Sequence, residues 1–378
     1  KYPEANAMQQ KMLGVSRLLQ TLREGGARRS AVTVNGSRLT RDELLERATR
    51  ELYTGQCNCA YWHGVFGGLY LSHLRRAVYA HLIAAEELAA RAVGGGRSVT
   101  ALDADGDGVE EVRLRTKAMS LLLDPDDGGT LTEWTLAGPR LNLLDTLTRR
   151  PEPYHRKVRS SSLSAVAAGA SAPASIHDLV GVKERDLESH LVYDDHRRSA
   201  FLDYALPRLP TLEEVVRSGW TGERCWSSGP FRWAASRGTA APLGVTMVRE
   251  LDGGRIRKTL RLEDRRMAVE CRYALEGLEA PVVALEFNVS LRDGRYLTTA
   301  GQGTAVTSFD VEEPALGVSL RLAIDPPATL FHFPIETVSE SEGGLERTYQ
   351  GLCLLCCWAL EPRRRAGPWG CRLHWSVR

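Results

Sequence analysis

The chain has 378 residues, of which 43% are hydrophobic, and at roughly 100–200 residues per domain this length allows two or three domains. Charged residues make up 25% and balance to a formal net charge of +2, which argues against a nucleic-acid-binding protein. No run approaches the ~18 apolar residues of a membrane span, and the first residues lack the apolar core of a signal peptide, so we expect a cytoplasmic location.

The first third of the chain has the apolar spacing of helices. Apolar residues recur at steps of three and four from Glu4 to Glu24, where two glycines end the pattern. Thr40 and Glu43 have the spacing of a capping box, which predicts a second helix over Arg41–Leu52. A third helix is predicted over Leu71–Val93, because three glycines follow it directly. Short connections between these helices predict a small bundle.

After the three glycines the pattern changes to short apolar runs separated by Asp, Gly and Pro. We therefore predict an α+β protein in which residues 1–96 form a three-helix bundle and residues 97–378 form a large antiparallel β-sandwich. The turns Asp252–Gly254 and Asp293–Gly294 predict paired strands on either side, and the Ser/Ala-rich stretch Ser160–Ser175 predicts a surface loop. The predicted strands are Val109–Leu114, Ser120–Leu123, Val245–Val248, Arg257–Leu262, Ala268–Tyr273 and Val318–Ile324.

Three aspartates alternate along a glycine-containing turn, as carboxylates do in calcium loops: Asp103, Asp105 and Asp107. An EF-hand is excluded because the twelfth position is Leu114 and a strand pattern follows. An acidic turn between two strands is favoured, with calcium as the second interpretation, and no other cofactor is expected. Adjacent carboxylates elsewhere are predicted to be solvated, namely Glu86–Glu87, Asp194–Asp195 and Glu312–Glu313.

Eight cysteines are too few and too irregularly spaced for a disulfide scaffold, so we expect a reducing compartment and mostly buried thiols. Cys353, Cys356, Cys371 and His374 superficially match the spacing of a structural zinc site. The run around the first two cysteines is apolar and strand-like, and residues three apart on a strand face opposite sides. The pattern therefore favours core packing over zinc.

The segment from Gln56 to Tyr70 is unusual for a helix connector, because it contains Tyr61, Trp62 and His63 among several glycines. An aromatic face can stack on a sugar ring, and Asn58 and His63 offer hydrogen bonds to hydroxyl groups. The alternative interpretation from the residues alone is a buried helix–helix junction.

This segment closely resembles the last conserved sequence block of glycoside hydrolase family 57, the α-amylase and 4-α-glucanotransferase family. The opening Lys1–Asn6 resembles the entry to the helical middle domain of that family. Asn142–His155 and Ser175–Asp178 resemble its C-terminal β domain, and Phe331–Gly351 contains the most specific match. The resemblance covers nearly the whole chain.

The resemblance implies a retaining enzyme that acts on α-1,4-glucan or maltooligosaccharide. In that family an N-terminal (β/α)7 barrel carries a glutamate nucleophile and an aspartate acid/base, which retaining chemistry places roughly 5–5.5 Å apart. The helical domain completes the active site, and the β-sandwich is of the galactose-mutarotase-like kind. The chain is then expected to follow the barrel, to have it as a partner, and to contain no catalytic residue itself. The implied substrate-binding residues are Asn58, Cys59, Tyr61, Trp62 and His63.

Cys59 departs from the pattern of the family, which usually has an aspartate at this position. A thiol cannot accept the charge-assisted hydrogen bonds that a carboxylate accepts from sugar hydroxyls. This substitution implies weakened or altered activity, or a divergent inactive relative. The competing hypothesis is a non-catalytic carbohydrate-binding or scaffolding protein that has lost the barrel.

Overall fold

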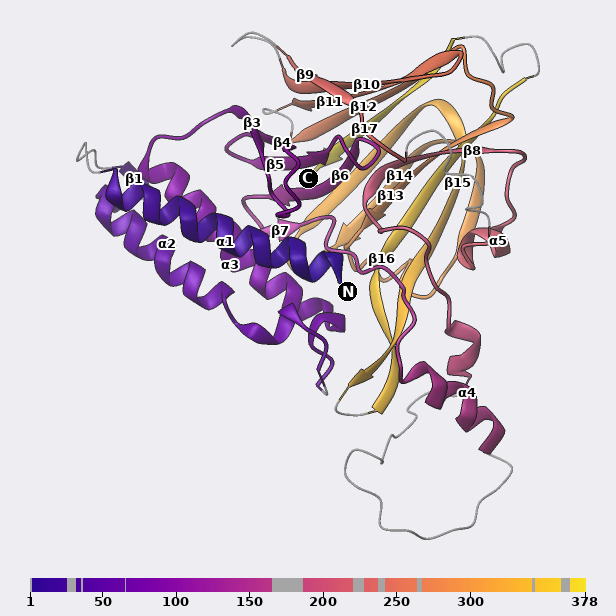
Figure 1. Ribbon diagram of the computed structural model, residues 1–378, viewed down its shortest axis with the longest axis horizontal. Helices are drawn as coiled ribbons and strands as arrows, with labels where there is room; N and C mark the ends of the chain where they lie inside the picture. The colour runs from indigo at the N-terminus through magenta and orange to yellow at the C-terminus, as the bar shows by residue number, and fades with distance from the viewer. Residues whose placement is uncertain are drawn as a thin grey trace.

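The computed structural model describes residues 2–25, 32–34, 37–64, 66–164, 186–219, 228–236, 242–263, 267–341, 344–361 and 368–378. Three long helices pack on one side of an extensive antiparallel sheet (Figure 1). Within the described ranges, every helix is too short or too polar to cross a bilayer.

The three long helices are α1 (Pro3–Glu24), α2 (Arg41–Gly55) and α3 (Ser72–Ala92), close to the predicted bounds. The predicted capping box is present at the start of α2: the Thr40 hydroxyl accepts from Glu43 N, and Thr40 N donates to the Glu43 carboxylate. A short hairpin, β1 (Val32–Val34) and β2 (Ser37–Leu39), lies between α1 and α2 and was not predicted. Members of the apolar core that the helices share include Met8, Val15, Leu19, Leu44, Ala48, Leu52, Val78, Leu82, Ile83 and Ala89.

The remaining strands form one sheet in the order β3-β4-β5-β6-β8-β13-β16-β15-β17-β12-β11-β10-β9, with β7 beside β6 and β14 beside β15. The two ends approach each other, since β3 contacts β10, and the sheet is nearly closed around its core. Trp134 and Trp375 meet edge to face inside it, with 6.2 Å between their ring centroids. The strands are β3 (Ser98–Leu102), β4 (Glu111–Arg115), β5 (Met119–Asp124), β6 (Thr130–Leu136), β7 (Leu141–Asn142), β8 (Ala200–Leu206), β9 (Arg232–Ala235), β10 (Leu243–Leu251), β11 (Gly254–Glu263), β12 (Ala268–Glu276), β13 (Val282–Val289), β14 (Gly301–Glu313), β15 (Val318–Ser341), β16 (Gly344–Ala359) and β17 (Trp369–Val377).

Each predicted strand overlaps an observed one, and the Asp252–Gly254 turn joins β10 to β11 as predicted. The pairing predicted across Asp293–Gly294 is wrong, because β13 pairs with β8 and β16 while β14 pairs with β15. The Asp293 carboxylate instead accepts hydrogen bonds from the backbone N–H groups of Arg295 and Glu312, so it fixes a long connection.

Short helices occupy the connections of the β region: α4 (His155–Ser164), η3 (Leu187–His190), α5 (Leu212–Val216) and η5 (Pro314–Leu316). The predicted loop Ser160–Ser175 is wrong in its first residues, because residues 160–164 continue α4. The rest of that predicted loop lies outside the described residues.

Buried ion pairs that were not predicted from the sequence join the helices to the sheet. Lys11 Nζ on α1 lies 2.7 Å from a carboxylate oxygen of Glu86 on α3 and 2.9 Å from one of Glu133 on β6. Glu4 pairs in the same way with Arg150, which follows β7. These contacts fix the helices against the sheet through charges that are withdrawn from water.

The prediction that adjacent carboxylates are solvated is therefore wrong for Glu86, Asp194 and Glu313, and Glu87 is solvated only in part. Glu86 is buried beside Lys11, and Glu313 is buried beside Arg76, 3.0 Å from its Nη2. The Asp194 side chain is fully buried; although burial would raise its pKa, Arg198 and Arg149 outweigh burial and hold that pKa well below its usual range. The cations that pair with Glu86 and Glu313 come from other elements of the fold, whereas Asp194 pairs both with Arg149 and with Arg198, which is four residues along the chain.

Candidate functional site

The connector between α2 and α3 presents two large aromatic side chains to solvent. It contains η1 (Asn58–Tyr61) and η2 (Gly68–Tyr70), and between them Trp62 is 56% exposed and Phe66 is 68% exposed. Large exposed aromatic groups on one loop are typical of binding surfaces, because a globular protein buries such groups when they have no partner.

Glycines hold the backbone of this loop in a fixed shape. Leu69 N donates to Trp62 O over 2.9 Å, and this contact brings Gly68 against the same carbonyl group. Gly68 has φ +46°, and a Cβ at this position would overlap Trp62 O. A Cβ on Gly64 would lie 2.6 Å from the Trp62 ring, so the ring packs directly over Gly64. The sequence therefore positions the tryptophan through the close approach that only glycine allows.

The other predicted site residues divide into two groups. Asn58 and Cys59 are exposed beside Trp62, and the Cys59 thiol lies 3.6 Å from Asn58 Oδ1. Tyr61 and His63 are half-buried and bind the loop itself: the Tyr61 hydroxyl donates to Gly55 O, and His63 Nδ1 lies 3.2 Å from Gly67 O. Burial raises the pKa of Tyr61. Both aromatic neighbours of Trp62 therefore contribute to the packing of the loop in this structure.

The loop is anchored to the β region by a cluster of polar aromatic residues. Tyr70 and Tyr2 each donate a hydroxyl hydrogen bond of 2.8 Å to Glu152 Oε1. The His63 ring packs 4.6 Å from the Tyr70 ring and 5.4 Å from the Tyr154 ring, measured between centroids. Sequence reasoning did not assign Glu152 or Phe66 to the site. Phe66 could have been found as the second large aromatic of the glycine-rich loop, whereas Glu152 gives no local signal.

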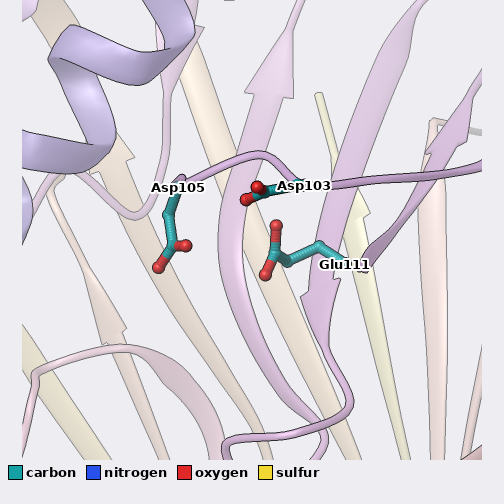
Figure 2. Close-up of side chains that lie close together, drawn as sticks. All are labelled: Asp103, Asp105 and Glu111. Atoms are coloured by element: carbon teal, nitrogen blue, oxygen red, sulfur yellow. The ribbon is translucent and has the colours of Figure 1, made fainter. Parts of the chain in front are cut away.

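A separate group of carboxylates lies on the turn between β3 and β4. Asp103, Asp105 and Glu111 each place one carboxylate oxygen within 4.8 Å of the other two, and their side chains converge (Figure 2). Asp107, predicted as a third ligand, lies outside this group, and its carboxylate accepts from Val109 N over 2.7 Å. Glu111 takes its place because the turn brings the first residue of β4 back beneath Asp103.

Burial, together with repulsion between neighbouring carboxylates, disfavours the charged forms of this acidic cluster. Burial, with the nearby charges of Asp105, Asp124 and Asp107, raises the pKa of Glu111 to about 7. The pKa of Asp105 is raised by burial and by its carboxylate neighbours. A hard divalent cation coordinated by these oxygens would offset the repulsion, so the chemistry of the donor set fits calcium. Calcium binding itself stays a prediction.

The cysteines of the rejected zinc pattern lie in the core of the sheet. Cys356 packs in the large core inside the curved sheet, whereas Cys353 packs in a second core on the opposite face of β16. Among the described cysteines, Cys57 and Cys59 are exposed and the five others are buried, so the prediction of buried thiols holds for those five.

Two family models match the chain. The model "Alpha-amylase/4-alpha-glucanotransferase, C-terminal" covers residues 103–367, and the model for the middle domain of the same family covers residues 1–89. The chain belongs to the α-amylase/4-α-glucanotransferase family. This result confirms the resemblance inferred from the Gln56–Tyr70 segment.

Similar members of this family carry both names. "Alpha-amylase 1" of Dictyoglomus thermophilum is 31% identical over 370 residues, which cover 94% of this chain and 50% of that protein. A 4-α-glucanotransferase of Thermococcus kodakarensis is 30% identical over 371 residues, covering 97% of this chain and 50% of that protein. The chain thus spans about half the length of the curated relatives it matches.

A solved structure shows that the fold is shared as well. The crystal structure of 4-α-glucanotransferase from Thermococcus litoralis matches with a TM-score of 0.74 at 23% sequence identity. The match covers all of this chain and 52% of that one. The helices and the antiparallel sheet therefore share the fold of the corresponding part of that enzyme.

Proposed function

We propose that this chain is the C-terminal portion of an α-1,4-glucan-processing enzyme of the 4-α-glucanotransferase or α-amylase type. Membership of the family and the names of its relatives support this proposal. The observation that carries it is the exposed Trp62 ring, which is fixed on a glycine-supported loop as a platform for a sugar ring. A glucose ring presents an apolar C–H face that such a platform can bind.

The neighbouring residues have separate roles in this proposal. Asn58 and Cys59 are exposed beside Trp62 and contact sugar hydroxyls, whereas Tyr61 and His63 hold the loop backbone in place. Because a thiol is a weak acceptor, Cys59 contributes less to hydroxyl binding than the aspartate usual in the family. The second exposed aromatic residue, Phe66, packs against the catalytic barrel or the bound glucan.

Catalysis itself belongs to the barrel that the resemblance implies. The nucleophile and the acid/base lie on that barrel, a few ångströms apart, and attack and protonate the glycosidic linkage. This chain supplies one wall of the binding cleft and excludes water from it. We therefore propose that the chain binds maltooligosaccharides without turning them over when the barrel is absent.

Other predictions also remain proposals. We propose a division into a helical bundle at residues 1–96 and a galactose-mutarotase-like sandwich at residues 97–378, in a cytoplasmic enzyme.

Calcium bound by Asp103, Asp105 and Glu111 would stabilise the turn before β4. Added calcium chloride should then raise the melting temperature of the chain but not that of Asp103→Asn. An equal response of both proteins would contradict the calcium site.

A chimera tests the enzymatic role. The half of the Thermococcus kodakarensis 4-α-glucanotransferase that this chain does not match is joined to this chain in one polypeptide. We expect the chimera to transfer glucan units between maltotriose molecules and the isolated chain to show no turnover. Turnover by the isolated chain would contradict the placement of the catalytic carboxylates. A well-folded chimera that binds maltotriose without turnover would favour the alternative of a non-catalytic binding protein.

A further inference from the structure

A cavity lies between the C-terminal half of α3 and the sheet. It encloses about 390 Å³ and is bounded by α3, by Gly95 and Gly96 after it, by the β4–β5 turn and by the end of β6. This volume is within the range of small-molecule pockets. Ser72, where α3 begins after the Trp62 loop, and Glu87 are 15 residues apart along the helix, which at ~1.5 Å per residue corresponds to roughly 22 Å. The cavity is therefore distinct from the site described above.

Glu87 contributes a carboxyl group to the lining of this cavity. Its Oε1 is buried and has no hydrogen-bond partner among the described residues, and its Oε2 lies 3.9 Å from Arg91 Nη2. Burial raises the pKa of Glu87 to about 7, although Arg91, Arg115 and Arg140 act in the opposite direction. A strongly perturbed carboxyl group in a cavity is a recognised mark of a binding or catalytic site.

The rest of the lining determines which ligands fit. Arg91, Arg115 and Lys117 line the cavity with Glu87, whereas Ile83 and Met119 contribute apolar surface. The basic groups oppose a cationic ligand, and the carboxyl group of Glu87 opposes an anionic one. A hydroxyl group suits both the acidic and the basic lining groups, because it can donate to the carboxylate and accept from a guanidinium or ammonium group.

We propose that this cavity binds a neutral polyhydroxylated ligand through Glu87, Arg91 and Lys117. The polyol class follows from the lining, and its identity as a glucose unit of a maltooligosaccharide rests on the proposed function. A second glucan-binding site at this distance from the Trp62 loop would hold a long chain at two points. Binding at two connected points raises the affinity for long chains far more than for short ones.

Maltotriose is the probe for this site, used with the full chain and the variant Trp62→Ala. Hydrogen–deuterium exchange should show protection of residues 87–96 and 115–120 on addition of maltotriose to both proteins. In the Trp62→Ala background, Glu87→Ala removes the acceptor and Ala137→Leu fills the cavity from the opposite wall. Either change should weaken the remaining binding, measured by calorimetry, by about tenfold or more. Glu46→Ala, on the exposed face of α2, is the matched control and should bind as its parent does.

Two results would overturn the inference. The first is unchanged exchange at residues 87–96 and 115–120 under conditions that protect residues 56–70. The second is binding by the Glu87→Ala and Ala137→Leu variants that equals that of their parent. Failure of the proposed function gives a different pattern, namely protection of the cavity segments without protection of residues 56–70.

Discussion

Arg75 on α3 and Asp145 after β7 form a buried ion pair, with 2.8 Å between Nε and Oδ1 and side chains only 1% and 8% exposed. Arg75 Nη1 also donates to Leu69 O in the connector that carries Trp62. One guanidinium group thus links α3, the sheet region and the candidate binding loop. Burial raises the pKa of Asp145 even beside this cation, so Arg75 offsets only part of the cost of burying the carboxylate.

Replacement of this arginine tests the link. Arg75→Ala leaves Asp145 buried without its partner, and we expect the free energy of unfolding to fall by about 3 kcal/mol. Urea denaturation measures the change. Arg50→Ala is the control, because its pair with Glu46 is exposed and should contribute less than about 0.5 kcal/mol. Equal effects of the two substitutions would contradict the structural role of Arg75.

The shape of the loop depends on Gly68. Gly68→Ala places a methyl group against Trp62 O at a positive φ, so the loop must move and maltotriose binding should weaken about tenfold. Gly14→Ala is the matched control, since its Cβ would meet no atom within 4 Å, its φ is ordinary and it lies outside both proposed binding sites. Calorimetry compares the two variants. Wild-type affinity in Gly68→Ala would show that the loop conformation is not required.

The carboxyl group of Glu111 predicts a pH dependence of stability. Its pKa rises from 4.5 to about 7 on folding. Its favourable contribution to the free energy of unfolding is therefore present below pH 4.5 and is lost as the pH rises through 7. In the presence of EDTA, Glu111→Gln should therefore stabilise the chain at pH 8 by about 1 kcal/mol relative to the wild type, and by less at pH 5. Urea denaturation at both pH values measures this difference. A wild-type chain that is the more stable of the two at pH 8 would contradict the prediction.

Local signals in the sequence were sufficient to predict the three long helices and six of the strands. The capping box of Thr40 and Glu43, and glycines after α1 and α3, define helix ends through contacts between near neighbours in the chain. The Gln56–Tyr70 segment could be singled out in the same way, because its aromatic residues and glycines are consecutive.

Features that depend on distant partners could not be predicted. Glu86 appeared solvated because Lys11, which neutralises it, lies 75 residues away in the sequence. The strands on either side of Asp293 pair with other strands, and a two-residue turn signal cannot reveal this. Glu111 was missed as a member of the acidic cluster, because its position beside Asp103 depends on the turn geometry.

Thiol reactivity tests the environments of the cysteines. The variant Cys225→Ser removes the one cysteine outside the described residues. In this variant we expect the thiols of Cys57 and Cys59 to react rapidly with a disulfide reagent. The other five are buried in the two cores, and burial raises the pKa of each, so they should react only on unfolding. Rapid reaction of more than two thiols would contradict the packing of β12, β16 and β17.

The role of Trp62 as a sugar-binding platform is tested most directly by calorimetric titration of the chain with maltotriose, using Trp62→Ala and Trp233→Ala in a Glu87→Ala background. Both tryptophans are exposed, but Trp233 lies on the edge strand β9, away from the connector. If Trp62 is the platform for a sugar ring, Trp62→Ala weakens binding about tenfold, whereas Trp233→Ala leaves it unchanged. Equal affinity of the Trp62→Ala variant and its parent would contradict the account of this loop as a glucan-binding site.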